Sequence, residues 1–282
     1  MIDMYEFYFS TKPIRVEALV DAYDVIHPEG YYFPGESHDF WEMVFVCDGS
    51  AALTADERVY HLGKGSLVFH KPMEFHRVWS EAGSAPHLII LSFKASGEWI
   101  SRFEDRCFVL DAAQQKHMET LSGLFLETLD LAETTDAYQY RMILERAVAQ
   151  LELFLLQLLE KEEVAPVVPQ SADAQYTQIV NVMKQNCHRA LTLGELARLC
   201  NMTVSNMKRI FHRFSDMGIA KYYLCLRMRR AKELLDEGFS ACEVAQKLDF
   251  SESSYFYTTF KREVGMTPNQ YKRSRAAVSE EK

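Results

Sequence analysis

The sequence predicts a multidomain α+β protein, in which an N-terminal β-barrel and some helices precede an all-α domain with two helix-turn-helix units. Three observations predict this fold class. Short apolar segments separated by turns fill residues 1–110, a proline-containing break lies at 161–175, and one helical pattern occurs twice after it. At 282 residues the chain is long enough for two domains, each with its own core.

The first 110 residues have the sequence pattern of a small β domain. Their apolar stretches are short, and Gly, Pro, Asp and Ser separate them. Examples are WEMVFVC (41–47), SLVFH (66–70) and HLIILSF (87–93). This pattern predicts a compact β-barrel or sandwich.

Two helices are expected after the barrel, over residues 114–133 and 136–161. The second has a stripe with 4-3-4-3-4 spacing, formed by Tyr140, Leu144, Ala147, Leu151, Phe154 and Leu158. Because neighbouring apolar residues widen the stripe, we expect one side of the helix to pack on its own domain and another to meet a second copy. Residues 111–161 are therefore a predicted dimerisation segment of a homodimer, with packing wholly inside the chain as an equal alternative.

Charge divides the chain at the expected linker, residues 162–175, where Pro166 and Pro169 interrupt any helix. Residues 1–175 carry 13 Lys and Arg against 29 Asp and Glu, net −16, whereas residues 176–282 carry 18 against 11, net +7. A basic C-terminal part on an acidic body predicts a module that binds a polyanion. A basic domain without a nucleic-acid role remains possible on charge alone.

Composition argues against a membrane protein and a disulfide-rich protein. No run reaches the roughly 18 apolar residues of a membrane span, and the N-terminus has no basic region followed by an apolar stretch. The six cysteines show no CxxC or Cys/His clustering. We therefore expect a cytoplasmic protein with reduced thiols.

The helical pattern that occurs twice predicts two helix-turn-helix units. LGELARLCNMTVSNMKRIF (193–211) is echoed by ACEVAQKLDFSESSYFYTTF (241–260). Ala197 and Ala245 are the small residues that let a second helix approach the first, and Thr203 can cap the helix that follows the first turn. These features place a DNA-reading helix at the end of each unit.

The two reading helices are predicted to differ in chemistry. The outward residues of the first are Ser205, Asn206, Lys208, Arg209 and His212, which are donors suited to base edges and phosphates. Those of the second are Ser253, Ser254, Tyr255, Tyr257, Thr258 and Lys261, while Phe256 and Phe260 face the core and Phe250 fills the turn. We predict that the first unit supplies most base recognition and the second mainly contacts phosphates, with Tyr255 or Thr258 at thymine methyls.

A helix over residues 220–238 should join the two units. A helix of about 18 residues is roughly 27 Å long. That length would place the two DNA-reading helices in successive major grooves on one side of the DNA. Of Arg227, Arg229 and Arg230 on this helix, one is expected to form an internal ion pair, and the others to be solvated or to face phosphate.

The C-terminal part resembles the AraC/XylS-type bacterial transcription regulators over residues 176–275. The resemblance rests on LTLGELA, Tyr222, Leu226-Arg227, Ala231, Leu234-Leu235, Phe250, Ser254-Tyr255-Phe256, Phe260-Lys261, Gly265, Thr267-Pro268 and Tyr271. It implies a DNA reader that is usually an activator in contact with RNA polymerase. Two departures occur: Asp249 stands where the family usually has glycine, and the glycine expected after the first reading helix is displaced to Gly218.

The barrel contains segments similar to the two cupin motifs. Gly30, Glu36, His38, Glu42 and Gly49 follow the first motif, and Gly65, Pro72 and His76 follow the second. In enzymatic cupins such positions hold a metal, although Glu36 replaces the first histidine here. Glu36, His38, Glu42 and His76 are therefore conceivable ligands of a divalent metal.

The resemblance to regulators with this architecture favours an organic effector in the barrel, and we expect no metal or other cofactor. The expected effector-binding residues are Tyr32, Glu36, His38, Trp41, Glu42 and His76. Aromatic faces with convergent polar groups suit a sugar or a small aromatic compound.

The leading hypothesis is thus a DNA-binding transcription regulator, not an enzyme, whose small-molecule effector changes how the linker or the preceding helices hold the DNA-binding part. A metal-dependent cupin enzyme with a basic appendage is the alternative. A protein-interaction module, with the basic domain as decoration, is a third hypothesis.

Overall fold

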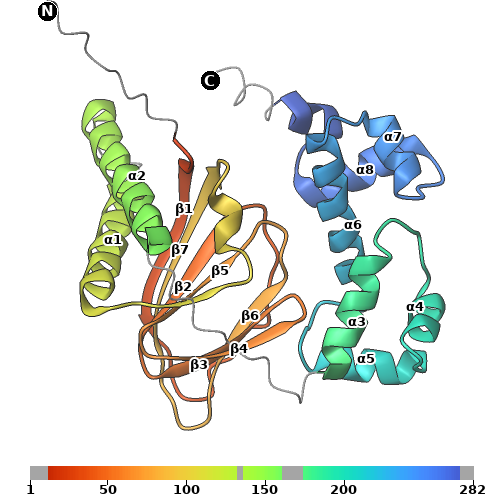
Figure 1. The fold of residues 1–282 in the computed structure, drawn as a ribbon, viewed down its shortest axis with the longest axis horizontal. Helices are drawn as coiled ribbons and strands as arrows, with labels where there is room; N and C mark the ends of the chain where they lie inside the picture. The colour runs from red at the N-terminus through yellow and green to blue at the C-terminus, as the bar shows by residue number, and fades with distance from the viewer. Residues whose placement is uncertain (1–11, 132–135, 161–173, 274–282) are drawn as a thin grey trace, which may run out of the picture.

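The computed structural model describes residues 12–131, 136–160 and 174–273. A two-sheet domain with two helices on one side comes first, and a group of helices follows it (Figure 1). The predicted fold class, a β-sheet domain before a helical helix-turn-helix domain, is confirmed. In the described ranges no helix is long and apolar enough to cross a membrane.

The N-terminal domain consists of two antiparallel sheets. The larger has the strand order β1-β7-β2-β5-β8, and the smaller has the order β4-β3-β6. In chain order the strands are β1 (Arg15–Ile26), β2 (Trp41–Asp48), β3 (Ser50–Ala55), β4 (Arg58–Gly63), β5 (Ser66–His70), β6 (His76–Ser80), β7 (His87–Ser96) and β8 (Cys107–Val109), with a 3-10 turn η1 (Ile100–Phe103) before β8.

Strand β2 shows how the domain divides its side chains. Trp41, Met43 and Phe45 lie in the core between the large sheet and the helices, whereas Val44 and Val46 lie in the core between the two sheets. Successive residues of a strand point to opposite faces, so this buried strand supplies both cores. Glu42 shares the face of Val44 and therefore points between the sheets.

Helices α1 (Ala112–Leu131) and α2 (Ala137–Glu160) lie side by side against the large sheet (Figure 1). The C-terminal half of the α2 stripe, Leu151, Phe154 and Leu158, is buried in the core shared with the sheet. Packing inside the chain therefore accounts for that half of the stripe. Tyr138 and Met142, near the start of α2, are exposed, and homodimer formation stays a prediction.

The helical part places one helix-turn-helix unit at each end of α6 (Ile219–Asp236) (Figure 1). The first unit contains α4 (Leu193–Leu199) and α5 (Val204–His212), packed on α3 (Ala174–Gln185); the second contains α7 (Ala241–Lys247) and α8 (Ser253–Val264). Helix α3 begins inside the expected linker 162–175, so the last two linker positions are helical. Residues 161–173 of that prediction lie outside the described residues.

Local signals set the boundaries of these helices. Reciprocal capping boxes begin α4 at Thr192 and α7 at Ser240, and the Thr203 side chain caps α5 as predicted. In the two turns, Asn201 and Asp249 both have φ 55°. Asp249 thus adopts the left-handed conformation, which glycine adopts most readily.

A buried polar contact joins the two domains at Asp56, in the turn between β3 and β4. Its carboxylate lies 2.6 Å from Arg229 Nη1 and 3.3 Å from Lys184 Nζ, and it accepts a 2.8 Å hydrogen bond from the Tyr222 hydroxyl. Burial opposes ionisation of Asp56, yet the charges of Arg229 and Lys184 outweigh it and lower the pKa of this carboxyl. The contact therefore holds an ion pair at neutral pH.

The arginines of α6 correct one expectation. Arg229 makes the predicted internal ion pair, but Arg227 is also buried, donates to the carbonyl of Leu248 and lies 4.2 Å from the centre of the Phe250 ring. Arg230 pairs with two glutamates of its own helix region, Glu233 and Glu237. The expectation of solvated or phosphate-facing side chains was wrong for Arg227, because the turn of the second unit needs a donor for its buried carbonyl.

Candidate DNA-binding surface and ligand sites

The outer face of α5 carries the polar residues that the sequence assigns to DNA. Met207, Ile210 and Phe211 are buried beneath it. Ser205, Lys208, Arg209 and His212 are exposed and Asn206 is half-buried. The helix therefore turns its apolar stripe inward and its donors outward, as DNA reading requires.

Two contacts already orient this face. Arg209 donates a 2.8 Å hydrogen bond to Asn206 Oδ1, one helical turn earlier. His212 Nδ1 lies 3.7 Å from a carboxylate oxygen of Asp216, which also accepts a hydrogen bond from the Tyr32 hydroxyl of the sheet domain. The end of the first reading helix is thus in contact with the N-terminal domain.

On the outer face of α8, the polar side chains form hydrogen bonds with neighbouring residues of the same segment. The Ser254 hydroxyl lies 3.0 Å from Glu252 Oε2, and the Thr258 hydroxyl donates to the Ser254 carbonyl. Tyr257 is half-buried and packs against the core of the second unit, so it is less free than the sequence indicated. Ser253 is also half-buried, whereas Ser254, Tyr255, Thr258 and Lys261 are exposed.

Four residues of the N-terminal domain converge at one end of the space between the sheets. His76 Nε2 lies 3.3 Å from Glu42 Oε1 and 4.0 Å from Glu36 Oε1, and His38 Nε2 lies 3.6 Å from Glu42 Oε2. One donor atom from each of these four residues lies within 4.8 Å of all the others. The sequence named this set, and the fold brings it together.

The backbone fixes the cluster from two segments. Glu36 and His76 exchange backbone hydrogen bonds of 2.9 and 3.0 Å, which set them opposite each other. Gly35 has φ 97°, and a Cβ there would lie 2.6 Å from the Phe75 ring and 2.7 Å from the His76 carbonyl. Only glycine permits this close approach.

Burial and neighbouring charges shape the ionisation of the cluster. Burial opposes the charged form of Glu42, but His76 outweighs it, so the pKa of Glu42 lies well below its ordinary value. Burial also opposes protonation of His76, and the charge of Glu42 raises the pKa of His76. A negative carboxylate therefore lies deep in the domain, where it calls for a compensating positive charge.

Sequence reasoning missed two neighbours of the cluster. The His70 ring stacks on His76 with 4.2 Å between ring centres, and His70 Nδ1 lies 3.3 Å from Glu74 Oε2. His70, Glu74 and His76 are all buried in the apolar surroundings of β5 and β6. His70 lies six positions before His76 and Glu74 two positions before it, and neither belongs to the motif, so no signal in the sequence indicated them.

The other two residues predicted to bind the effector lie elsewhere. Trp41 is next to Glu42 on β2 and so points to the opposite face of the sheet. Tyr32 is 45% exposed and contacts Asp216 of the helical part. Both residues therefore lie apart from the cluster. For Trp41 this was predictable, because neighbouring side chains of a strand such as β2 point to opposite faces.

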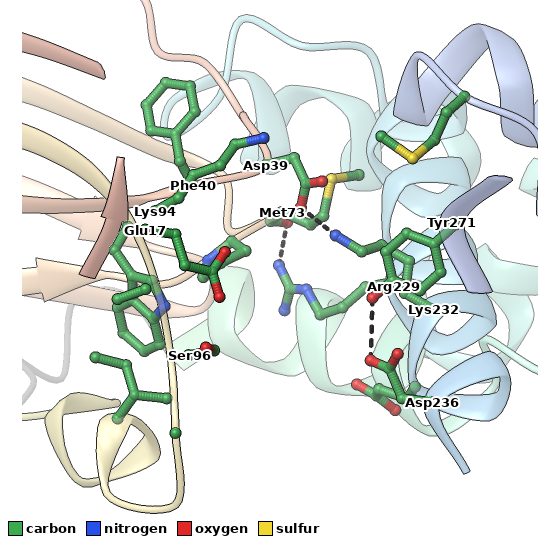
Figure 2. Close-up of a pocket in the computed structure, with 17 residues that line it drawn as sticks. Glu17, Asp39, Phe40, Met73, Lys94, Ser96, Arg229, Lys232, Asp236 and Tyr271 are labelled. Carbon is green, nitrogen blue, oxygen red and sulfur yellow. Dashed lines mark hydrogen bonds and ion pairs between the residues drawn. The ribbon is translucent and has the colours of Figure 1, made fainter. Parts of the chain in front are cut away.

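A cavity of about 450 Å³ lies between the sheet domain and the C-terminal half of α6. Figure 2 shows Glu17, Lys94 and Ser96 on one side, and Lys232, Asp236 and Tyr271 on the other. Trp41 and Met73 also line it. The cavity is therefore built by both domains.

Comparison with known proteins assigns both halves of the chain. Residues 22–151 match the model of the AraC-like ligand binding domain, and residues 196–274 match a helix-turn-helix domain model. The chain belongs to the AraC-type regulators. An AraC-type regulator of this organisation is a ligand-responsive, DNA-binding transcription regulator, which favours the leading hypothesis over a cupin enzyme.

Named relatives of this AraC-type chain are also regulators. The transcriptional activator RhaR of Mannheimia succiniciproducens is 23% identical over 85% of this chain and 87% of its own length, and the Msm operon regulatory protein of Streptococcus mutans is 22% identical over 86% and 88%. The uncharacterised regulator YpdC of Escherichia coli is 32% identical over 100 residues, 35% of each chain.

Proposed function

We propose that this regulator binds promoter DNA in a sequence-specific manner, with α5 as the main base reader and α8 as the weaker one. The observation that carries the proposal is the pair of largely exposed reading faces in the units at opposite ends of α6. The exposed basic residues Lys208 and Arg209 lie on α5, whereas α8 offers mainly hydroxyl groups beside Glu252. An acidic side chain at that position opposes a close approach of phosphate.

Docking of the N-terminal domain leaves both reading faces open. The domain contacts α6 through Arg229 and Tyr222 and α3 through Lys184, whereas most of the outward residues of α5 and α8 are exposed. The effector would therefore act on the relative orientation of the two units and not by uncovering a blocked surface. This is a shift between populations of domain arrangements.

We place the organic effector in the cavity between the domains. Apolar side chains such as Leu53, Val68 and Leu88 pack the space between the sheets, which leaves the domain boundary as the better site for an organic molecule. The cavity combines the rings of Trp41 and Tyr271 with charged side chains and has a volume usual for small-molecule sites. A sugar or small aromatic compound there would touch both domains at once.

Three finer features complete the proposal and follow the family resemblance. The protein would act as an activator, contact RNA polymerase and form a homodimer. The exposed Tyr138 and Met142 at the start of α2 support a surface for the second copy. We propose no catalytic activity.

Selection from random DNA with the full-length protein tests the central claim. We expect an enriched site with two conserved patches about one helical turn apart, and an affinity that falls steeply with salt concentration. Enrichment of no sequence, with binding equal to that of bulk DNA, would contradict sequence-specific regulation.

The effector site has its own test. Compounds from a panel of sugars and small aromatic acids that raise the melting temperature of the parent protein should fail to do so in Ser96→Phe, which fills the cavity from its wall. If a compound raises the melting temperature of Ser96→Phe as much as that of the parent protein, the effector does not bind in this cavity.

A further inference from the structure

At the buried end of the cluster, two histidine rings each turn one nitrogen toward a backbone carbonyl and the other toward the Glu42 carboxylate. His38 Nδ1 lies 3.1 Å from the Phe40 carbonyl oxygen, and His76 Nδ1 lies 3.1 Å from the Glu74 carbonyl oxygen. A carbonyl oxygen only accepts hydrogen bonds, so Nδ1 of each ring carries the proton and donates it. Histidines that bind metals are commonly held by such a bond from the nitrogen that does not bind the metal.

The Nε2 atoms of the two histidines lie next to the oxygens of one carboxylate. Nε2 of His38 and Nε2 of His76 are buried and make no hydrogen bond to any residue that the structure describes. Both lie within 3.6 Å of Glu42, which is 7% exposed and also accepts a 3.2 Å hydrogen bond from Ser92. A metal cation bound between the two Nε2 atoms and the Glu42 carboxylate would supply the positive charge that this buried carboxylate requires.

The spacing and chemistry of the donors suit a transition metal. Two ligands about 2.1 Å from a tetrahedral metal lie roughly 3.4 Å apart. Three carboxylate-to-nitrogen distances in the cluster are 3.3, 3.6 and 4.0 Å, and one donor atom from each of the four residues lies within 4.8 Å of the others. Two imidazoles with two carboxylates favour a first-row transition metal over Mg²⁺ and Ca²⁺, which prefer oxygen alone. The Glu36 side chain is 51% exposed, which leaves a path from solvent.

We propose that Glu36, His38, Glu42 and His76 bind one divalent first-row transition-metal ion, which fixes the two segments on which α6 docks. The binding site stands on the donor geometry alone. The second part, control of docking, rests on the proposed function.

The segments that carry the ligands also make the contacts between the domains. Asp39, next to His38, pairs with Lys232 of α6. The carbonyl of Met73 accepts a hydrogen bond from Arg229, while its N–H donates to the His38 carbonyl at 2.6 Å. An ion that ties both segments together therefore also fixes the surface that α6 meets (Figure 2).

Phe75 adds an apolar contact to the same surface. It precedes His76, and its ring lies 5.6 Å from that of Tyr222 on α6. Its N–H also donates to Asp56 at 3.2 Å. One residue thus connects a metal ligand with the buried ion pair of the interface.

Zinc binding by the full-length protein, without a histidine tag and after removal of metals by a chelator, tests the site. Calorimetric titration and elemental analysis should give one Zn²⁺ per chain, and Mg²⁺ should not compete. Glu36→Gln changes a partly exposed side chain without disturbing its backbone bonds, and we expect it to weaken Zn²⁺ binding at least about tenfold, as His76→Gln should. His87→Gln, which alters a histidine paired with Asp24 outside the cluster, is the matched control and should bind like the parent.

Parent-like affinity in Glu36→Gln would overturn the site even if His76→Gln fails to fold. Titration with Co²⁺ separates the cluster from the free cysteines, because a thiolate ligand gives a charge-transfer absorption and a histidine and carboxylate site does not. Appearance of that band in the parent protein would assign the metal to cysteine and also overturn the proposal.

Hydrogen exchange measured by mass spectrometry tests the control of docking. Zn²⁺ should slow exchange in residues 222–232 of α6 in the parent protein and leave it unchanged in Glu36→Gln. Stoichiometric binding without any change in α6 would overturn the coupling and leave the site intact. Because neither measurement involves DNA, a failure here is distinct from a failure of the DNA selection.

Discussion

The two helix-turn-helix units share a scaffold but differ in how they are held and in what they present. The first is tied to the N-terminal domain through Lys184 on α3 and the adjoining half of α6, where Tyr222 meets the buried Asp56. The second meets that domain through the partly exposed pair of Lys232 and Asp39 and through Met73, which is buried in the core of that unit. The unit with the richer set of DNA-binding groups is thus the one that reaches the buried Asp56, through Lys184 and Tyr222, and we expect its position to be the better fixed.

Among the variants that test this comparison, removal of the Asp56 carboxylate should cause the largest change in stability. Asp56→Ala leaves Arg229 buried without its partner, so we expect a loss of about 3–5 kcal/mol in the free energy of unfolding. Asp39→Ala breaks only the partly exposed pair with Lys232 and should cost about 0–1 kcal/mol. Denaturant unfolding of both variants measures the difference. Equal losses would show that the two units are held with equal strength.

The next largest effect is expected at the reading surfaces. Arg209→Ala on α5 should weaken binding to the selected DNA site by about 1–3 kcal/mol and relax specificity at one base position. Lys261→Ala on α8 should weaken binding less than Arg209→Ala does, and by the same factor for every DNA sequence. It should also reduce the dependence of binding on salt concentration. Both side chains are exposed, so folding is unaffected. A larger specificity loss in Lys261→Ala would reverse the assignment of the main base reader.

The starts of the two reading helices differ in a way that can be measured separately. Thr203 caps α5 with its side chain, whereas Glu252, at the corresponding position of α8, makes no such hydrogen bond. Thr203→Ala should therefore cost about 1 kcal/mol of stability, while Glu252→Ala should cost nothing and Glu252→Ser should stabilise α8. Thermal unfolding compares the three variants. A loss in Glu252→Ala that matches Thr203→Ala would mean that the two helix starts are equivalent.

The smallest effect is expected from pH near neutrality. The pKa of Asp56 is lowered in the folded protein, so its stabilising contribution is complete above its ordinary value near 3.9 and is lost as the pH falls through the lower folded value. The groups that face it are Arg229, Lys184 and two phenols, Tyr222 and Tyr176, whose raised pKa values keep them neutral. The stability difference between the parent and Asp56→Ala should be constant from pH 6 to 8 and shrink below about pH 4. A difference that changes between pH 6 and 8 would identify another titrating group at the interface.

Much of the helical part was predictable because its signals are local. Capping residues, small residues at helix contacts and apolar stripes act over three to eight positions, so Thr203, Ala197 and Phe256 could be assigned from the sequence. The cluster residues Glu36, His38, Glu42 and His76 could also be named, since motif spacing indicated them. Their neighbours His70 and Glu74 could not, because no motif includes them.

What the sequence by itself determined was the fold class, the opposite charges of the two halves, the family and the outward residues of α5. Only the tertiary structure decided which distant groups meet. It paired Asp56 with Arg229, 173 positions later, and placed Trp41 in a cavity between the domains. Such pairs depend on how the two domains dock. The spacing of apolar residues shows which face of one helix or strand is buried, but it does not show which parts of another domain that face will meet.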